Sequence, residues 1–144
     1  MTKISQAALI AVAFAASLAT APAFADMSTF KATLSGDQEV PPTTSKATGT
    51  VEATYDSAAK KLSWKGSYAD LTGAASAAHF HGPAEPGKNA GVEVPVTPIA
   101  SPFEGSATLT DSQTADLLGG KLYFNIHTAA NPNGEVRGQV MMAK

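Results

Sequence analysis

Short runs of alternating apolar and polar residues, separated by Gly, Pro, Asn and Asp, recur along most of this chain. A period of two is the pattern of a strand that buries one face, and the closely spaced turn residues leave little room for long helices. The predicted strands cover residues 29–34, 48–55, 62–68, 74–81, 92–96, 103–109, 121–127 and 135–141. We therefore predict an all-β fold, a Greek-key β-sandwich or flattened barrel of about eight short strands.

Two segments depart from simple alternation or from strand propensity. Residues 111–118 are predicted to form one short helix, because Thr110 or Asp111 can cap its start and Gly119-Gly120 can close its end. Residues 74–81 are rich in alanine, so propensity alone favours a helix there. Flanking glycines and a proline keep this segment short, and we predict a strand.

The first 25 residues are predicted to be a signal peptide. Lys3 gives a positive start, residues 7–19 are apolar, and Ala23-Phe24-Ala25 has the small-x-small form of a cleavage site. An uncleaved membrane anchor is the alternative, although the apolar run is short for a bilayer span. Residues 26–144 then form one domain, periplasmic or secreted, with no membrane span after cleavage.

Composition narrows the partners and the metal chemistry. The chain has no cysteine, so disulfides, thiolate catalysis and Cys-ligated metal centres are excluded. The net charge is −2, or −3 once Lys3 leaves with the signal peptide, and no basic cluster is present. This argues against nucleic acid and against an anionic membrane surface as partners.

Two of the three histidines, His79 and His81, stand two residues apart. On a strand both side chains leave the same face, with Cα atoms about 6.5–7 Å apart, while Phe80 points the other way. The third histidine, His127, lies on another predicted strand. If the two strands are neighbours, the three imidazoles meet and can hold one metal ion.

We predict a metal site formed by His79, His81 and His127. Neutral imidazole suits Cu(II), Zn(II) or Ni(II), and the affinity order of divalent ions favours copper. Asn125, Glu135 or a water completes the shell in this hypothesis, and three protein ligands leave a position open. The alternative is that the histidines are structural, hydrogen-bonded strand residues.

Four segments share their residues and their order with a known family. They are LSGDQEVPP at 34–42, AHFHGP at 78–83, LGGKLYFNIHT at 118–128 and NGEVRGQV at 133–140, with Gly49, Tyr55 and Leu62 between the first two. The chain resembles the CHRD domain, the repeated module of chordin that also occurs as a single exported domain in bacteria. The resemblance covers nearly all of residues 26–144 and implies an all-β, extracytoplasmic domain.

The resemblance implies less about activity. Bacterial members generally lack an assigned reaction, and growth-factor binding is better known for the cysteine-rich modules that neighbour this domain in chordin. The family pattern places the three histidines at recurring positions, together with Glu39, Glu135 and Arg137. A Glu beside a turn and an Arg on a strand can pair and fix a loop. The roles of these last three residues stay open.

Two functions of different classes follow. The first is an exported domain that binds a transition metal, copper before zinc. The second is a non-catalytic, extracytoplasmic protein-interaction or adhesion module with structural histidines and a protein partner. No catalytic residue is predicted, because no nucleophile motif such as GxSxG is present. A redox enzyme with a mononuclear copper centre stays open.

Overall fold

The computed structural model describes residues 24–144. The predicted signal peptide, residues 1–25, lies outside the described residues except for its last two. The elements are β1 (Met27–Ser35), η1 (Gly36–Gln38), β2 (Thr48–Asp56), β3 (Lys61–Ala69), β4 (Ala75–His81), β5 (Val92–Pro95), β6 (Phe103–Thr108), α1 (Asp111–Leu118), β7 (Tyr123–Thr128), β8 (Val136–Gln139) and β9 (Met141–Met142). The predicted all-β class and the single α-helix are confirmed for this part of the chain. No helix within it combines the length and apolar character that a bilayer span requires.

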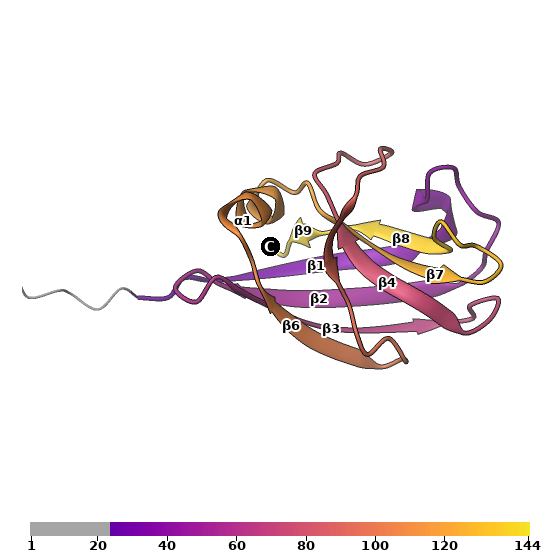
Figure 1. Ribbon diagram of the computed structural model, residues 1–144, viewed down its shortest axis with the longest axis horizontal. Helices are drawn as coiled ribbons and strands as arrows, with labels where there is room; N and C mark the ends of the chain where they lie inside the picture. Colours follow the sequence, from indigo (N-terminus) through magenta and orange to yellow (C-terminus); the bar gives the residue numbers. More distant parts are fainter. Residues whose placement is uncertain (1–23) are drawn as a thin grey trace, which may run out of the picture.

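The strands form one antiparallel sheet in the order β5-β4-β7-β8-β1-β2-β3-β6, and β9 pairs with β1. The sheet curls into a flattened, nearly closed barrel (Figure 1). Strands β1, β2, β3 and β6 form one half, and β5, β4, β7 and β8 form the other. Strands β4 and β7 are far apart in the sequence but adjacent in the sheet, and this adjacency places the candidate site.

Four aromatic rings join the two halves of the barrel. Trp64 of β3 meets Phe80 of β4 edge-on, with 5.2 Å between ring centroids. Phe103 of β6 stacks on Phe124 of β7 at 5.7 Å, and Phe80 lies 4.9 Å from Phe124 on the adjacent strand. Rings of this size dominate the energetics of a small core, so their packing fixes where β4 and β7 lie.

Helix α1 begins with the cap that the sequence offers. The Thr110 hydroxyl accepts a hydrogen bond from the backbone N–H of Gln113, and the Gln113 side chain accepts one from the backbone N–H of Thr110. This reciprocal pair is a capping box, which satisfies two of the free N–H groups at the helix start. Leu117 is fully buried and attaches the helix to the core.

The outer face of β4, β7 and β8 is buried as well, which alternation did not predict. Tyr123, Asn125 and Arg137 point away from the barrel interior, yet only 3%, 2% and 1% of their surfaces are exposed. We call this face the polar layer; its side chains are His79, His81, Tyr123, Asn125, His127, Glu135 and Arg137, with Glu39 lying against them. A buried polar layer is stable only if its groups find hydrogen-bond partners.

Loops provide that cover and many of those partners. The side chain of Asn89, in the β4–β5 loop, donates to the backbone oxygen of Val40, in the η1–β2 loop (2.9 Å). Thr43, also in the η1–β2 loop, donates from its hydroxyl to the backbone oxygen of Glu135 (2.8 Å). The polar layer therefore lies between the sheet and loops that are tied to one another.

Glu135 is the anionic anchor of this layer. Its fully buried carboxylate accepts hydrogen bonds from Ser45 Oγ (2.7 Å), the Thr72 backbone N–H (2.9 Å), Thr72 Oγ1 (2.7 Å) and Thr128 Oγ1 (2.6 Å). Burial raises the pKa of Glu135, but these hydrogen bonds outweigh it and bring the pKa down from 4.5 to about 2. As an anion, the side chain therefore joins the η1–β2 loop, the β3–β4 loop and the end of β7.

We expect Glu135→Gln to lower the free energy of unfolding by about 1–3 kcal/mol at pH 7, because hydrogen bonds to a charged acceptor are replaced by neutral ones. The pKa of Glu135 is about 4.5 in the unfolded chain and about 2 in the folded protein. The stabilisation from Glu135 is therefore present above pH 4.5 and is lost as the pH falls toward 2, because the unfolded chain takes up the proton first. The variant should lose that part of the acid sensitivity in urea unfolding curves measured between pH 7 and 2.

The matched control is Glu52→Gln, a charge loss at an exposed position on β2. We expect it to change the unfolding free energy by less than about 0.5 kcal/mol. Acid unfolding of Glu135→Gln that coincides with that of the unsubstituted protein would contradict the role of Glu135.

Candidate metal centre

Strands β4 and β7 pair side by side, which is the condition for the three histidines to meet. Their register sets His127 opposite Ala77 and Asn125 opposite His79, so His127 is the diagonal neighbour of His79 on the outer face. Phe80 points inward and is fully buried, as expected from the alternation. Each histidine offers one ring nitrogen, and the three nitrogens lie within 4.8 Å of one another.

The three rings form a compact cluster at the rim of the polar layer. The ring centroids are separated by 5.0 Å between His79 and His127, 5.3 Å between His79 and His81, and 6.1 Å between His81 and His127. His81 is buried, whereas His79 and His127 are half-buried. The cluster is therefore reachable from solvent while its inner ring is held by the protein.

Backbone carbonyls determine which nitrogens of the cluster are free. His81 Nδ1 lies 3.1 Å from the oxygen of Ala90, and His127 Nδ1 lies 2.9 Å from the oxygen of Pro132. Because a carbonyl oxygen only accepts, both Nδ1 atoms carry a proton, and each neutral ring keeps its lone pair on Nε2. His127 Nε2 accepts from His79 Nδ1 at 3.1 Å. His81 Nε2 is buried with no hydrogen-bond partner within residues 24–144.

The surroundings favour neutral imidazoles. Burial lowers the pKa of His79 below 6.5, and the neighbouring His127 and His81 lower it further. Burial also lowers the pKa of His81, against the hydrogen bond to Ala90, which raises it. Both rings are therefore mainly neutral at pH 7, the form in which imidazole binds a metal ion.

Tyr123 is a site residue to which the sequence assigned no role. Its ring lies parallel to that of His81, with a 2° interplanar angle and 4.8 Å between centroids. Arg137 places its guanidinium carbon 3.4 Å from the Tyr123 ring centroid. The sequence contains one indication of its role: Tyr123 and His127 are four residues apart on the same strand, so their side chains leave the same face.

Glu39 is buried in the polar layer, with 5% of its surface exposed. Its carboxyl group covers Gly134, where a Cβ atom would overlap Glu39 Oε1 and lie 2.7 Å from Asn125 Nδ2. Burial raises the pKa of Glu39 to about 7, although Arg137, Asn125 and a backbone N–H at Val40 each lower it. At neutral pH this carboxyl group is therefore partly protonated, unlike Glu135.

Arg137 forms no salt bridge with Glu39 or Glu135 within residues 24–144, although its charge lowers the pKa of Glu39. The ion pairs within residues 24–144 join Lys60 to Asp111, Lys65 to Glu52 and Lys121 to Glu85. Glu135 and Arg137 are two residues apart at β8, and separate loops satisfy each of them: Arg137 donates to the backbone oxygen of Lys88 (2.6 Å) and to Asn89 Oδ1 (3.0 Å). Glu135 also does not join the cluster of possible ligands.

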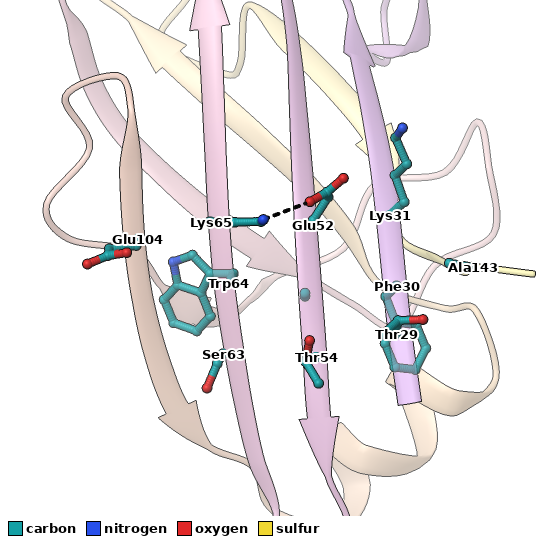
Figure 2. Close-up of a pocket in the computed structure, with 11 residues that line it drawn as sticks. Thr29, Phe30, Lys31, Glu52, Thr54, Ser63, Trp64, Lys65, Glu104 and Ala143 are labelled. Atoms are coloured by element: carbon teal, nitrogen blue, oxygen red, sulfur yellow. Dashed lines mark ion pairs between the residues drawn. The ribbon is translucent and has the colours of Figure 1, made fainter. Parts of the chain in front are cut away.

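The other half of the barrel carries a hollow of about 500 Å³, drawn in Figure 2. Across its floor runs a row of alternating charges on four adjacent strands, Lys31, Glu52, Lys65 and Glu104. Lys65 and Glu52 form an exposed ion pair at 3.2 Å. Cross-strand pairing accounts for this row, so the hollow carries no functional argument, and the histidine cluster is the better candidate site.

Comparison with known proteins gives a family match. No curated protein and no solved structure matches it. One family profile, described as the CHRD domain, matches residues 30–140. That range contains every strand pair and loop that builds the polar layer, including all three histidines. The chain belongs to the CHRD domain family.

Proposed function

We propose that this protein is an extracytoplasmic CHRD-domain protein that binds one transition metal ion through His79, His81 and His127. Copper is the favoured metal and zinc is the second choice. The observation that carries the proposal is the convergence of three imidazole nitrogens within 4.8 Å on two paired strands. Membership of the CHRD family supports the extracytoplasmic location, and the predicted signal peptide at 1–25 is part of the same proposal.

The geometry fits a metal ion after small movements. Ligand nitrogens about 2.0–2.1 Å from a tetrahedral ion are about 3.4 Å from one another, and His79 Nδ1 already lies 3.1 Å from His127 Nε2. To bind the ion through Nδ1, His79 would change to the tautomer that is protonated on Nε2. The unpartnered Nε2 of His81 is a buried lone pair that a metal ion would satisfy. Carbonyl acceptors on Nδ1 of His81 and His127 are the outer-shell contacts that orient metal-binding histidines.

The three donor nitrogens also limit which metal ions can bind. Three neutral nitrogens without thiolates suit Cu(II), Zn(II) or Ni(II), and among divalent ions Cu(II) binds such sites most strongly. A bound ion would supply a Lewis acid, or a redox centre in the case of copper, with a coordination position left for water or a ligand. No residue of the cluster is assigned a catalytic role.

The competing function is a protein-interaction or adhesion module in which the histidines are structural. The hydrogen bond between His79 Nδ1 and His127 Nε2 favours it, because that bond joins β4 to β7 without any metal. It leaves His81 Nε2 without a well-formed hydrogen bond within residues 24–144, however, although the Asn125 side chain is close enough to raise the pKa of His81. Burying a polar atom that lacks a good partner costs about 1–3 kcal/mol. For that reason we place metal binding first.

We expect the purified domain, residues 26–144, to bind about one equivalent of Cu(II) or Zn(II) at pH 7.5 in titration calorimetry. The double variant His79→Ala/His81→Ala removes two of three ligands and should weaken binding at least about 100-fold. The control is Ser63→Ala/Lys65→Ala, which has the same spacing on an exposed face of β3. An unchanged titration for the histidine double variant would rule out this site.

Metal affinity should also depend on pH in a defined direction. Protons compete for the ring nitrogens, and the pKa values of His79 and His81 lie below 6.5. Binding should therefore persist as the pH falls to 6.5 and weaken steeply between about pH 6 and 5. Competition titrations with a chelator from pH 7.5 to 4.5 measure this. An affinity that stays constant down to pH 4.5 points to carboxylate ligands instead.

A further inference from the structure

Arg137 is buried in an unusual way. Only 1% of its surface is exposed, and it takes part in no ion pair within residues 24–144. Burial lowers the pKa of Arg137, and the charge of Glu39 opposes this, but the Glu39 carboxyl group is partly protonated at neutral pH. Other contacts must therefore compensate much of the cost of burying the guanidinium. Its guanidinium lies 3.4 Å from the centroid of the Tyr123 ring, a cation–π contact that is strongest when it is desolvated.

The Tyr123 ring connects Arg137 to a proposed metal ligand. His81 is on β4 and Arg137 is on β8, and these strands flank β7 on opposite sides. The two side chains therefore cover opposite faces of the Tyr123 ring, with the imidazole parallel to it at 4.8 Å. The result is a stack of guanidinium, phenol and imidazole across three strands.

A second route runs from Arg137 to His81 through the β4–β5 loop. The guanidinium donates to the backbone oxygen of Lys88 (2.6 Å) and to Asn89 Oδ1 (3.0 Å). The next residue, Ala90, has the carbonyl oxygen that lies 3.1 Å from His81 Nδ1. The Tyr123 hydroxyl donates to this same oxygen (3.1 Å) and accepts from the Ala90 N–H (3.2 Å).

Both routes converge on one imidazole. The stack restrains the plane of the His81 ring, and the Ala90 carbonyl restrains its protonated nitrogen. A ring held at its face and at Nδ1 has one remaining polar atom, Nε2. If Arg137 only anchored the loop, its two hydrogen bonds to the loop would be enough. The guanidinium also lies over the centre of the Tyr123 ring, a contact that loop anchoring does not require.

We infer that Arg137 is a positioning residue for the proposed metal site, acting on His81 through Tyr123 and the Ala90 loop. The inference rests on the proposed function for the metal itself. The placement of the His81 ring in the metal-free protein is a separate, measurable part of it.

The test replaces Arg137 by Met, which is similar in length and uncharged, and by Lys, which keeps the charge but lacks the planar fork that reaches two acceptors. Long-range proton–nitrogen NMR correlations on the metal-free protein report the His81 tautomer. We expect a single tautomer protonated on Nδ1 in the unsubstituted protein and a mixture in Arg137→Met. Cu(II) affinity should fall about 10- to 100-fold in Arg137→Met and by a smaller factor in Arg137→Lys.

Two further variants keep the test decisive. Lys65→Met removes one positive charge from an exposed position on the other half of the barrel and should leave both the tautomer and the affinity unchanged. Tyr123→Leu removes the stacked ring while Arg137 stays, and it replaces Arg137→Met if that variant does not fold cooperatively. It should give the same mixture of tautomers and the same loss of affinity.

The outcomes separate the two proposals. A folded Arg137→Met or Tyr123→Leu variant with the His81 tautomer and the Cu(II) affinity unchanged overturns the positioning role. A mixture of His81 tautomers in the unsubstituted, metal-free protein overturns it as well. If the unsubstituted protein binds no metal but shows one fixed tautomer that is lost in Arg137→Met, the placement of His81 by Arg137 stands and the proposed metal function fails.

Discussion

The antiparallel pairing of β4 with β7 is the constraint on which the site depends. These strands come from distant parts of the chain, and their shared register sets two histidines of one strand beside the histidine of the other. The pairing is held from within by Phe80 and Phe124, which contact each other and the rings of the opposite half of the barrel. Apolar packing inside the barrel thus determines the geometry of polar groups outside it.

The polar layer is the second distinctive feature, because it buries charge and hydrogen-bonding groups outside the apolar core. Burial raises the pKa of two carboxyl groups in this layer, but the final pKa values differ in direction. Glu135 accepts enough hydrogen bonds to stay ionised, with a pKa of about 2, whereas Glu39 lacks them and has a pKa of about 7. Arg137 is stabilised by an aromatic face and a loop. The layer closes three loops over the sheet and leaves the histidine cluster at its rim.

The sequence predicted the strands, the helix and its cap well, because these depend on local patterns. Alternation placed Phe80 inside and the histidines outside, and Thr110 was one of two predicted caps for α1. The convergence of His79, His81 and His127 required one further assumption, that their strands are neighbours. A period of two indicates which residues share a face, but not which strand or loop covers that face.

That limit explains what sequence reasoning missed. Alternation placed Tyr123 and Asn125 on the face of His127, but it did not predict that this face is buried, because the loops that cover it are distant in sequence. The sequence left the roles of Glu135 and Arg137 open. In the structure Glu135 binds Ser45 and Thr72, and Arg137 binds Lys88 and Asn89. Hydrogen bonds over such separations have no local signature.

The most direct measurement is an anomalous difference map from crystals of the domain grown with copper. We expect one strong peak beside β4 and β7, at a bonding distance of about 2 Å from one nitrogen each of His79, His81 and His127. Copper bound elsewhere on the molecule, or no ordered copper while the His79 and His127 rings stay hydrogen-bonded to each other, would contradict it.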